Sequence, residues 1–349
     1  VTIDNCQLGQ GVELKGGYFN KSVFLEKANM GSGAQVREGC ILEEEANGAH
    51  CVGLKQTILF PFVTLGSLIN FCDCFMAGGL SRKEHSEVGS SYIHFNYTPD
   101  GDKTTASLIG DVPKGVMLNQ PPIFLGGQGG IVGPIRMGFG NVVAAGSILR
   151  KDYPEDNKLI IGKAHTPKTI DFTLSVYTNL NLILCNNIIY LANLMALETW
   201  YINVRRPFFD VLEFGNLIYE GLLDKLMLAK KERLKRLQVL SEKVKILSDD
   251  EKEGSKVQAA MKKEFNEKFI EIERLYKDAF HDDESERSRD DFLSLFEKIK
   301  EGNKSGYLSV IQGLPDYVSK KGTLWLKRVV DAYCQKAKAI LPALKMPNT

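Results

Sequence analysis

A six-residue period in the large aliphatic side chains is the feature that most constrains how this chain can fold. Its longest uninterrupted run consists of Leu125, Ile131, Met137, Val143 and Leu149, with glycine after several of these residues or nearby. Six matches neither the 3.6-residue period of a helix nor the two-residue alternation of a half-buried strand. One large aliphatic residue in six, with small or turn-forming residues between, is typical of short strands joined by tight bends. Stacked coils of this kind predict a β-solenoid.

The same rhythm runs through earlier parts of the chain, at Met30, Val36 and Leu42 and again at Val52 and Ile58. A generic glycine-rich β-sandwich is the alternative that the pattern leaves open. The period breaks at 78–87 and at 97–105, which are rich in charged and turn-forming residues. Insertions into a solenoid project from one edge and often form its binding surface.

Glycine content divides the chain into two regions, because 25 of the 32 glycines precede residue 166. We therefore predict a β-solenoid domain over residues 1–165 and an all-α domain over residues 166–349, with 154–167 as the linker. Beyond the linker the apolar residues recur every three or four positions, over 223–240 and 265–275. This pattern predicts a long helical hairpin with a polar turn at 249–254, followed by helices at 292–299, 307–318 and 323–340.

The balanced charge argues against binding to nucleic acid, because the net charge is only +1. Seven cysteines without paired C-x-x-C spacing, and no signal-peptide pattern, predict reduced thiols in a cytoplasmic protein. The most apolar stretch, 180–195, contains four asparagines. An amide in lipid is costly without a partner, so we expect a buried helix rather than a membrane span.

Two further clusters have competing interpretations. Trp200, Tyr201, Arg205 and Arg206 form either an anion pocket or, as we favour, an aromatic anchor with arginines at a helix end. A zinc site at Cys72, Asp73, Cys74 and His85 is not favoured, because a C-x-C pair leaves the ligand number and geometry open. We predict no metal.

Three segments carry a resemblance to a known family: EVGSSYIHFNYTPDGDK at 87–103, GGQGGIVGPIRMG at 126–138 and NVVAAGSILRKD at 141–152. Over residues 31–169 the chain resembles the left-handed β-helix acyltransferase domain of the bifunctional N-acetylglucosamine-1-phosphate uridylyltransferase/glucosamine-1-phosphate acetyltransferase family. The resemblance implies a left-handed parallel β-helix that assembles as a homotrimer. It also implies acetyl-CoA lying against the coils and a sugar phosphate in a cleft between neighbouring subunits.

The family's functional residues can be carried over at several positions. The resemblance implies that Asn96 and Tyr97 lie beside the acetyl group and that Lys103 contacts the sugar-phosphate ligand. Arg37 opens an R-x-G-x-x-L segment that matches a phosphate-binding arginine. Lys55 is a nearby substitute for the family's phosphate-binding lysine, whose own position is occupied by a proline.

The catalytic histidine of the family falls on Asp73, and an asparagine of its sugar site falls on Glu87. Acetyl transfer from a thioester to an amine needs a base that accepts the amine proton, and an aspartate has an ordinary pKa of about 3.9, well below that of histidine. Asp73 therefore acts as the base only if burial raises its pKa, or if it orients a protonated amine. His94 and His85 are the possible replacements.

Small residues at Gly127, Ala144 and Ala145 allow a pantetheine arm to approach the backbone closely, and tight coils would require small residues there in any case. Lys151 and Lys163 are candidate contacts for the coenzyme phosphates.

Two functional hypotheses follow. The first is acetyl transfer from acetyl-CoA to an amino-sugar phosphate such as glucosamine 1-phosphate. The second is a catalytically inactive trimeric scaffold, which binds a sugar phosphate or nucleotide sugar or serves a nucleotidyltransferase domain outside this sequence. Since the chain begins at Val1 within the repeat pattern, we expect an upstream segment. The helical domain is expected to pack or to bind a protein partner.

Overall fold

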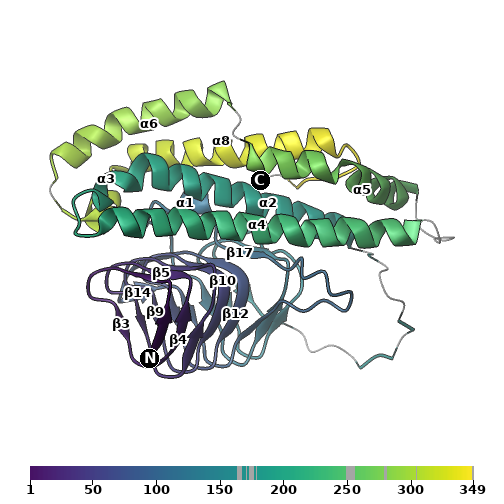
Figure 1. Ribbon diagram of the computed structural model, residues 1–349, viewed down its shortest axis with the longest axis horizontal. Coiled ribbons are helices and arrows are strands. Elements are labelled where there is room, and N and C mark those ends of the chain that lie inside the picture. The colour runs from purple at the N-terminus through teal and green to yellow at the C-terminus, as the bar shows by residue number, and fades with distance from the viewer. Residues whose placement is uncertain are drawn as a thin grey trace.

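The computed structural model describes residues 1–162, 167–169, 171–172, 177, 179–248, 256–278, 281–303 and 305–347. A parallel β-solenoid forms one layer, and helices are laid along one of its sides (Figure 1). The last strand ends at Ile160 and the first long helix begins at Leu180. The predicted solenoid followed by a helical region is confirmed. The predicted boundary at residue 165 lies outside the described residues.

Each complete coil contributes strands to three faces, which we number in chain order. Face one contains β1 (Thr2–Asp4), β4 (Gly17–Asn20), β7 (Ala34–Val36), β10 (Gly53–Leu59), β12 (Asn70–Met76), β16 (Ile93–Phe95), β19 (Gly130–Val132) and β22 (Ile148–Leu149). Face two contains β2 (Gln7–Leu8), β5 (Ser22–Phe24), β8 (Cys40–Leu42), the second halves of β10 and β12, β17 (Ser107–Ile109) and β20 (Arg136–Met137). Face three contains β3 (Glu13–Leu14), β6 (Asn29–Met30), β9 (Asn47–Gly48), β11 (Thr64–Leu65), β15 (Glu87–Val88), β18 (Phe124–Leu125), β21 (Val142–Val143) and β23 (Leu159–Ile160).

The hexapeptide aliphatic residues stack in register inside the coils. On face three Leu125 pairs with Val143, and on face one Ile131 pairs with Leu149. All four side chains are fully buried. The six-residue period thus reflects one inward-facing residue on each face. Burial of these aliphatic side chains supplies the main hydrophobic stabilisation of the solenoid.

The corner between faces one and two requires a left-handed backbone conformation. Lys21, Gly39, Gln56 and Asp73 occupy it in successive coils with φ angles of 45°, 79°, 49° and 59°. A non-glycine residue in this region costs roughly 1–2 kcal/mol, and aspartate is among the residues that tolerate it best. Asp73 therefore lies where β12 bends from one face to the next.

The first break in the period forms a short hairpin of β13 (Gly79–Ser81) and β14 (Glu84–His85). Arg82 at its tip donates from Nη1 to the carbonyls of Glu45 and Phe62 and to the hydroxyl of Thr64. The insertion therefore folds back over the corner of earlier coils, and Arg82 satisfies polar groups there.

The helical domain packs against face two of the solenoid. Its elements are α2 (Leu180–Trp200), the π-helical turn η1 (Tyr201–Arg205), α3 (Arg206–Phe209), α4 (Gly215–Ser248), α5 (Lys256–Lys277), α6 (Asp283–Glu301), α7 (Tyr307–Gln312) and α8 (Asp316–Ile340), and a short α1 (Val112–Gly115) lies within the solenoid. Helices α2 and α4 lie directly over the coils, α8 packs against α1, and α6 lies farther out (Figure 1).

Helices α4 and α5 pack together as the predicted hairpin, and the predicted turn at 249–254 lies outside the described residues. The prediction of one helix over 307–318 is wrong. Gly313 follows α7 and Pro315 precedes α8, and a proline lacks the N–H that would continue the earlier helix.

Three of the four asparagines of α2 bond to the solenoid. Asn186 donates to the carbonyl of Pro134 at 3.2 Å, and Asn187 donates to that of Thr104 at 3.0 Å. Asn193 accepts from the backbone N–H of Val112 at 3.0 Å. In the described part of the chain, Leu180–Phe209 is the one stretch long and apolar enough to cross a membrane, and 78% of its most apolar window is buried inside the protein. These contacts are those of a core helix.

We expect Asn193→Leu to lower the free energy of unfolding by about 1–3 kcal/mol, because it leaves the buried N–H of Val112 without an acceptor. Urea denaturation measures the change. Asn203→Leu is the matched control, since Asn203 is partly exposed and bonds only to a carbonyl of its own helix segment. Equal losses in the two variants would contradict the assigned role of Asn193.

Candidate functional site

The corner at Asp73 is closed by an arginine from the helical domain. Arg233 of α4 donates from Nη2 to Oδ1 of Asp73 at 2.6 Å and from Nη1 to the backbone carbonyl of Lys103 at 3.2 Å. The Arg233 and Asp73 side chains are only 2% and 7% exposed. Burial raises the pKa of Asp73, and the Arg233 guanidinium opposes that shift.

This arrangement leaves the Asp73 carboxylate facing the helical domain rather than a substrate. A general base must come within hydrogen-bond distance of the proton it removes. Here one carboxylate oxygen already accepts a charge-assisted hydrogen bond inside a buried interface. The geometry therefore supports a structural role for Asp73.

His94 occupies an inward position of the aliphatic ladder. It pairs with Ile131 in the neighbouring coil and is only 2% exposed. Its Nε2 lies 2.8 Å from Oγ of Ser107, another buried residue. Burial lowers the pKa of His94 to about 4, so the ring is neutral at physiological pH and enclosed within the coils. This geometry supports a core role for His94.

His85 lies on the β13–β14 hairpin, away from this ladder. Its Nδ1 lies 2.9 Å from the carbonyl oxygen of Arg82.

Several other predicted residues do gather near the Asp73 corner. Lys55 precedes the same corner one coil earlier and pairs with Glu38 at 2.7 Å. Arg37 lies one coil before that and is exposed. The pairing of Asn70 with Ile93 places Asn96 at the same corner of the following coil. We call Arg37, Lys55, Asp73 and Asn96 the corner cluster.

The loop after β16 carries Tyr97 and Lys103. The Tyr97 side chain is 70% exposed, whereas Lys103 is half-buried and its carbonyl contacts Arg233. Glu87 lies on face three, where it pairs with Thr64 and Phe124, so the structure separates it from the corner cluster.

The predicted coenzyme contacts lie elsewhere on the solenoid. Gly127, Ala144 and Ala145 are at the corner between faces three and one, where a Cβ on Gly127 would meet the Ser90 carbonyl at 2.8 Å. Lys151 follows β22 at the other edge of face one, with its ammonium 5.6 Å from the Tyr153 ring centre. Lys163 lies outside the described residues.

Sequence reasoning missed the residues from the later part of the chain that hold the corner and its loop. Besides Arg233, Tyr177 donates to Oδ2 of Asp102 at 3.1 Å and Lys243 donates to the carbonyl of Asp100. The lysines and arginines near Lys230 are typical of a solvated helix face, yet Arg233 is buried. The available signal was helical phase, because Arg233 adjoins Leu234 and falls on the buried side of α4 with Leu226 and Leu237.

Arg205 is enclosed at a second junction between the helices and the coils. It donates to Glu43 at 3.2 Å and to Glu44, and its guanidinium lies 3.8 Å from the Tyr307 ring centre. Tyr201 donates to Glu43. The cluster holds protein carboxylates and aromatic rings, which agrees with the aromatic-anchor interpretation for Arg205; no pocket for an external anion is formed by its contacts.

No family model matches the chain. Curated proteins do match part of it. Bifunctional protein GlmU of Thermotoga maritima is 27% identical over 152 residues, covering 44% of this chain and 30% of the relative. GlmU of Nitratidesulfovibrio vulgaris strain DP4 is 30% identical over 157 residues, and that of Fervidobacterium nodosum is 28% identical over 162 residues.

Over this part of its length the chain is similar to GlmU. The match to the Nitratidesulfovibrio vulgaris protein covers 43% of this chain and 30% of that relative. The match to the Fervidobacterium nodosum protein covers 46% of this chain and 32% of that relative. The chain thus spans about a third of the length of these relatives. The GlmU resemblance drawn from the sequence motifs is confirmed over less than half of this chain.

We expect Arg233→Met to destabilise the protein by about 3–5 kcal/mol, because it leaves the Asp73 carboxylate buried without a partner. The double variant Asp73→Asn, Arg233→Met should recover most of this loss in chemical denaturation. Arg236→Met is the control, since its pair with Glu232 lies one turn apart on the same helix and is more exposed. A loss in Arg233→Met no larger than in the control would disprove the buried pair.

The Glu43 junction predicts a pH dependence. Burial raises the pKa of Glu43 to about 7, although Arg205 opposes the shift. A raised carboxyl pKa favours folding fully below the unfolded value of about 4.5, and this contribution is lost as the pH rises through 7. Between these pH values, the unfolding free energy of the wild type should fall by on the order of 2 kcal/mol, and this fall should be absent in Glu43→Gln. Denaturation of wild type, Glu43→Gln and Glu45→Gln across this range measures it; a fall unchanged in Glu43→Gln contradicts the assignment.

Proposed function

We propose that this chain is an acyltransferase-like protein of a sugar-nucleotide pathway that binds a sugar phosphate or nucleotide sugar without transferring acetyl. The Asp73–Arg233 pair carries this proposal. The aspartate that replaces the family's base is held by the helical domain, and the candidate replacement His94 is enclosed in the coils. Similarity to GlmU supports the pathway and the class of ligand.

Acetyl transfer to an amine requires a proton acceptor beside the attacking nitrogen. Acetyl-CoA, when bound, would supply the activated acetyl group. The exposed Ala145 and neighbouring small residues leave a flat corner that fits a pantetheine arm. The corner cluster does not fit the reaction, since Asp73 is buried and paired. We therefore derive no transfer step.

Ligand binding at the corner cluster uses groups that are exposed or half-buried, one of which, Lys55, also pairs with Glu38. The guanidinium of Arg37 has a fork of donors suited to phosphate, and Lys55 provides a second cation on the neighbouring coil. Asn96 and Tyr97 supply polar groups on the following loop. This set can recognise an anionic sugar derivative without a base.

An active acetyltransferase is the second candidate. The observation that favours it is the placement of Asn96 beside the Asp73 corner, with Tyr97 exposed on the same loop. In this case glucosamine 1-phosphate would be acetylated by acetyl-CoA, in a homotrimer whose neighbouring subunit completes the site. The greater length of the relatives also agrees with a partner role beside a nucleotidyltransferase domain. Both forms of the proposal place the protein in the cytoplasm, with the outer helices free for a protein partner.

The deciding assay incubates the protein with acetyl-CoA and glucosamine 1-phosphate and follows the release of free thiol. We expect no release above background, while calorimetry with glucosamine 1-phosphate detects binding that Arg37→Ala weakens at least tenfold. Arg150→Ala, in the last coils of face one, is the control. Thiol release above background that Asn96→Ala abolishes would overturn the inactive form of the proposal and establish the acetyltransferase.

A further inference from the structure

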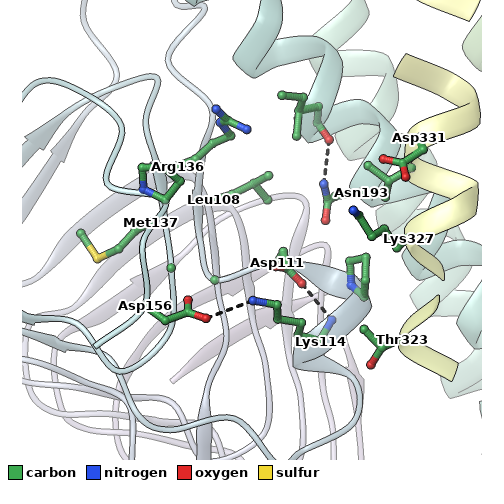
Figure 2. A pocket seen from close by; sticks show the side chains of 16 residues that line it. Leu108, Asp111, Lys114, Arg136, Met137, Asp156, Asn193, Thr323, Lys327 and Asp331 are labelled. Atoms are coloured by element: carbon green, nitrogen blue, oxygen red, sulfur yellow. Dashed lines mark hydrogen bonds and ion pairs between the residues drawn. The ribbon is translucent and has the colours of Figure 1, made fainter. Parts of the chain in front are cut away.

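A cavity of about 390 Å³ lies where the last coils of face two meet the helical domain. We call it the junction cavity. It is formed by β17 and β20 with α1 on the solenoid side and by α2 and α8 on the helical side (Figure 2). Its volume is within the range of small-molecule sites, about 300–1,000 Å³, and such sites occur preferentially between domains. It shares no lining residue with the corner cluster.

The floor of this junction cavity is apolar. Leu108, Met137, Ile189 and Val330 are all buried and line it. Asn193 also lines it, with its carbonyl oxygen accepting from Val112 and its amide donating to Ile189. The body of a ligand would therefore lie against fixed, well-packed groups rather than against mobile side chains.

Three cationic side chains from different elements reach the same cavity. Lys114 comes from α1, Arg136 from β20 and Lys327 from α8, and Figure 2 shows them arranged around one space. Lys114 pairs with Asp156 at 3.1 Å, and Arg136 is held by Oδ2 of Asp152 through Nε and Nη2 at 3.1 and 2.9 Å.

Lys327 differs from the other two cations. Among the described residues its ammonium has no hydrogen-bond or ion-pair partner, and the third guanidinium nitrogen of Arg136, Nη1, likewise bonds to none of them. The carboxylates of the cavity are engaged instead: Asp111 accepts from the Lys114 backbone N–H at 2.8 Å, Asp156 holds Lys114, and Asp331 has an interaction of its own. The lining thus carries three cations and three carboxylates, and the Lys327 charge also acts on Asp111. The donors that bond to none of the described residues are those of Lys327 and the Nη1 group of Arg136.

We propose that the junction cavity binds a small phosphorylated polyhydroxy compound, with its phosphate between Lys327 and Arg136. The second oxygen of Asp111, the hydroxyl of Thr323 and the engaged Asp156 are then positioned for the hydroxyl groups of the ligand. A phosphate needs several donors that converge from rigid supports, and here the supports belong to both domains. Occupancy would therefore link the helical domain to the solenoid. This site is separate from the one in the proposed function and does not depend on it.

The test is isothermal titration calorimetry on the full chain with glucose 1-phosphate, and with glucose and inorganic phosphate as separate probes. We expect glucose 1-phosphate to bind more tightly than either fragment. Lys327→Ala should weaken it at least tenfold without altering the unfolding midpoint, because Lys327 is exposed and unpaired. Thr323→Phe, which fills the cavity, should weaken it similarly.

Lys320→Ala is the matched control, since Lys320 lies on the same helix and pairs with Asp316 outside the cavity. Unchanged affinity in both Lys327→Ala and Thr323→Phe would overturn the proposal. If only Arg37→Ala abolished the binding of glucose 1-phosphate, the junction cavity would also be ruled out and the proposed function would stand. If only Lys327→Ala and Thr323→Phe abolished it, the result would support the junction cavity and count against the corner cluster. Two binding sites, each abolished by its own variants, would support both the corner cluster and the junction cavity. If no probe bound, both proposals would be overturned.

Discussion

The buried polar seam between the helical domain and face two is the constraint on which the rest of the structure depends. Apolar packing alone does not fix how a helix lies on a solenoid, because successive coils present similar surfaces. Here the Asp73–Arg233 pair and the Arg205 cluster fix α4 and η1 against particular coils. Buried ions and amides that lose their partners are costly, so shifts by one coil are excluded.

The same seam determines which chemistry remains available. A buried carboxylate with a guanidinium partner contributes to the fold, and it is withdrawn from proton transfer by the same contact. The coil corner at Asp73, where the family resemblance predicts a catalytic group, is an internal junction with the helical domain in this structure. The helical domain also encloses a concavity, the junction cavity, whose walls come from both domains. The closed corner and the junction cavity both result from the packing of the helices on face two.

Much of this could be predicted from sequence, and particular residues show where prediction stopped. The asparagines of α2 indicated a buried helix, because amides need partners, and for three of the four the solenoid backbone supplies those partners. The six-residue period also assigns His94 to the inward ladder, because His94 follows Val88 by six positions. Arg233 could be placed on the buried side of its helix, but no local pattern pairs it with Asp73, which lies 160 residues earlier.

By itself, the sequence determined the repeating solenoid, the helical hairpin and the change between them, since these follow from side-chain periodicity over short distances. It also located the residues that resemble the GlmU family. Only the tertiary structure decided which of those residues are exposed, because burial at a domain junction depends on the helix packed above each coil. Asp73 and Lys327 show the difference: one acid is paired with an arginine distant in sequence, while one lysine beside a cavity has no ion-pair partner among the residues that the structure describes.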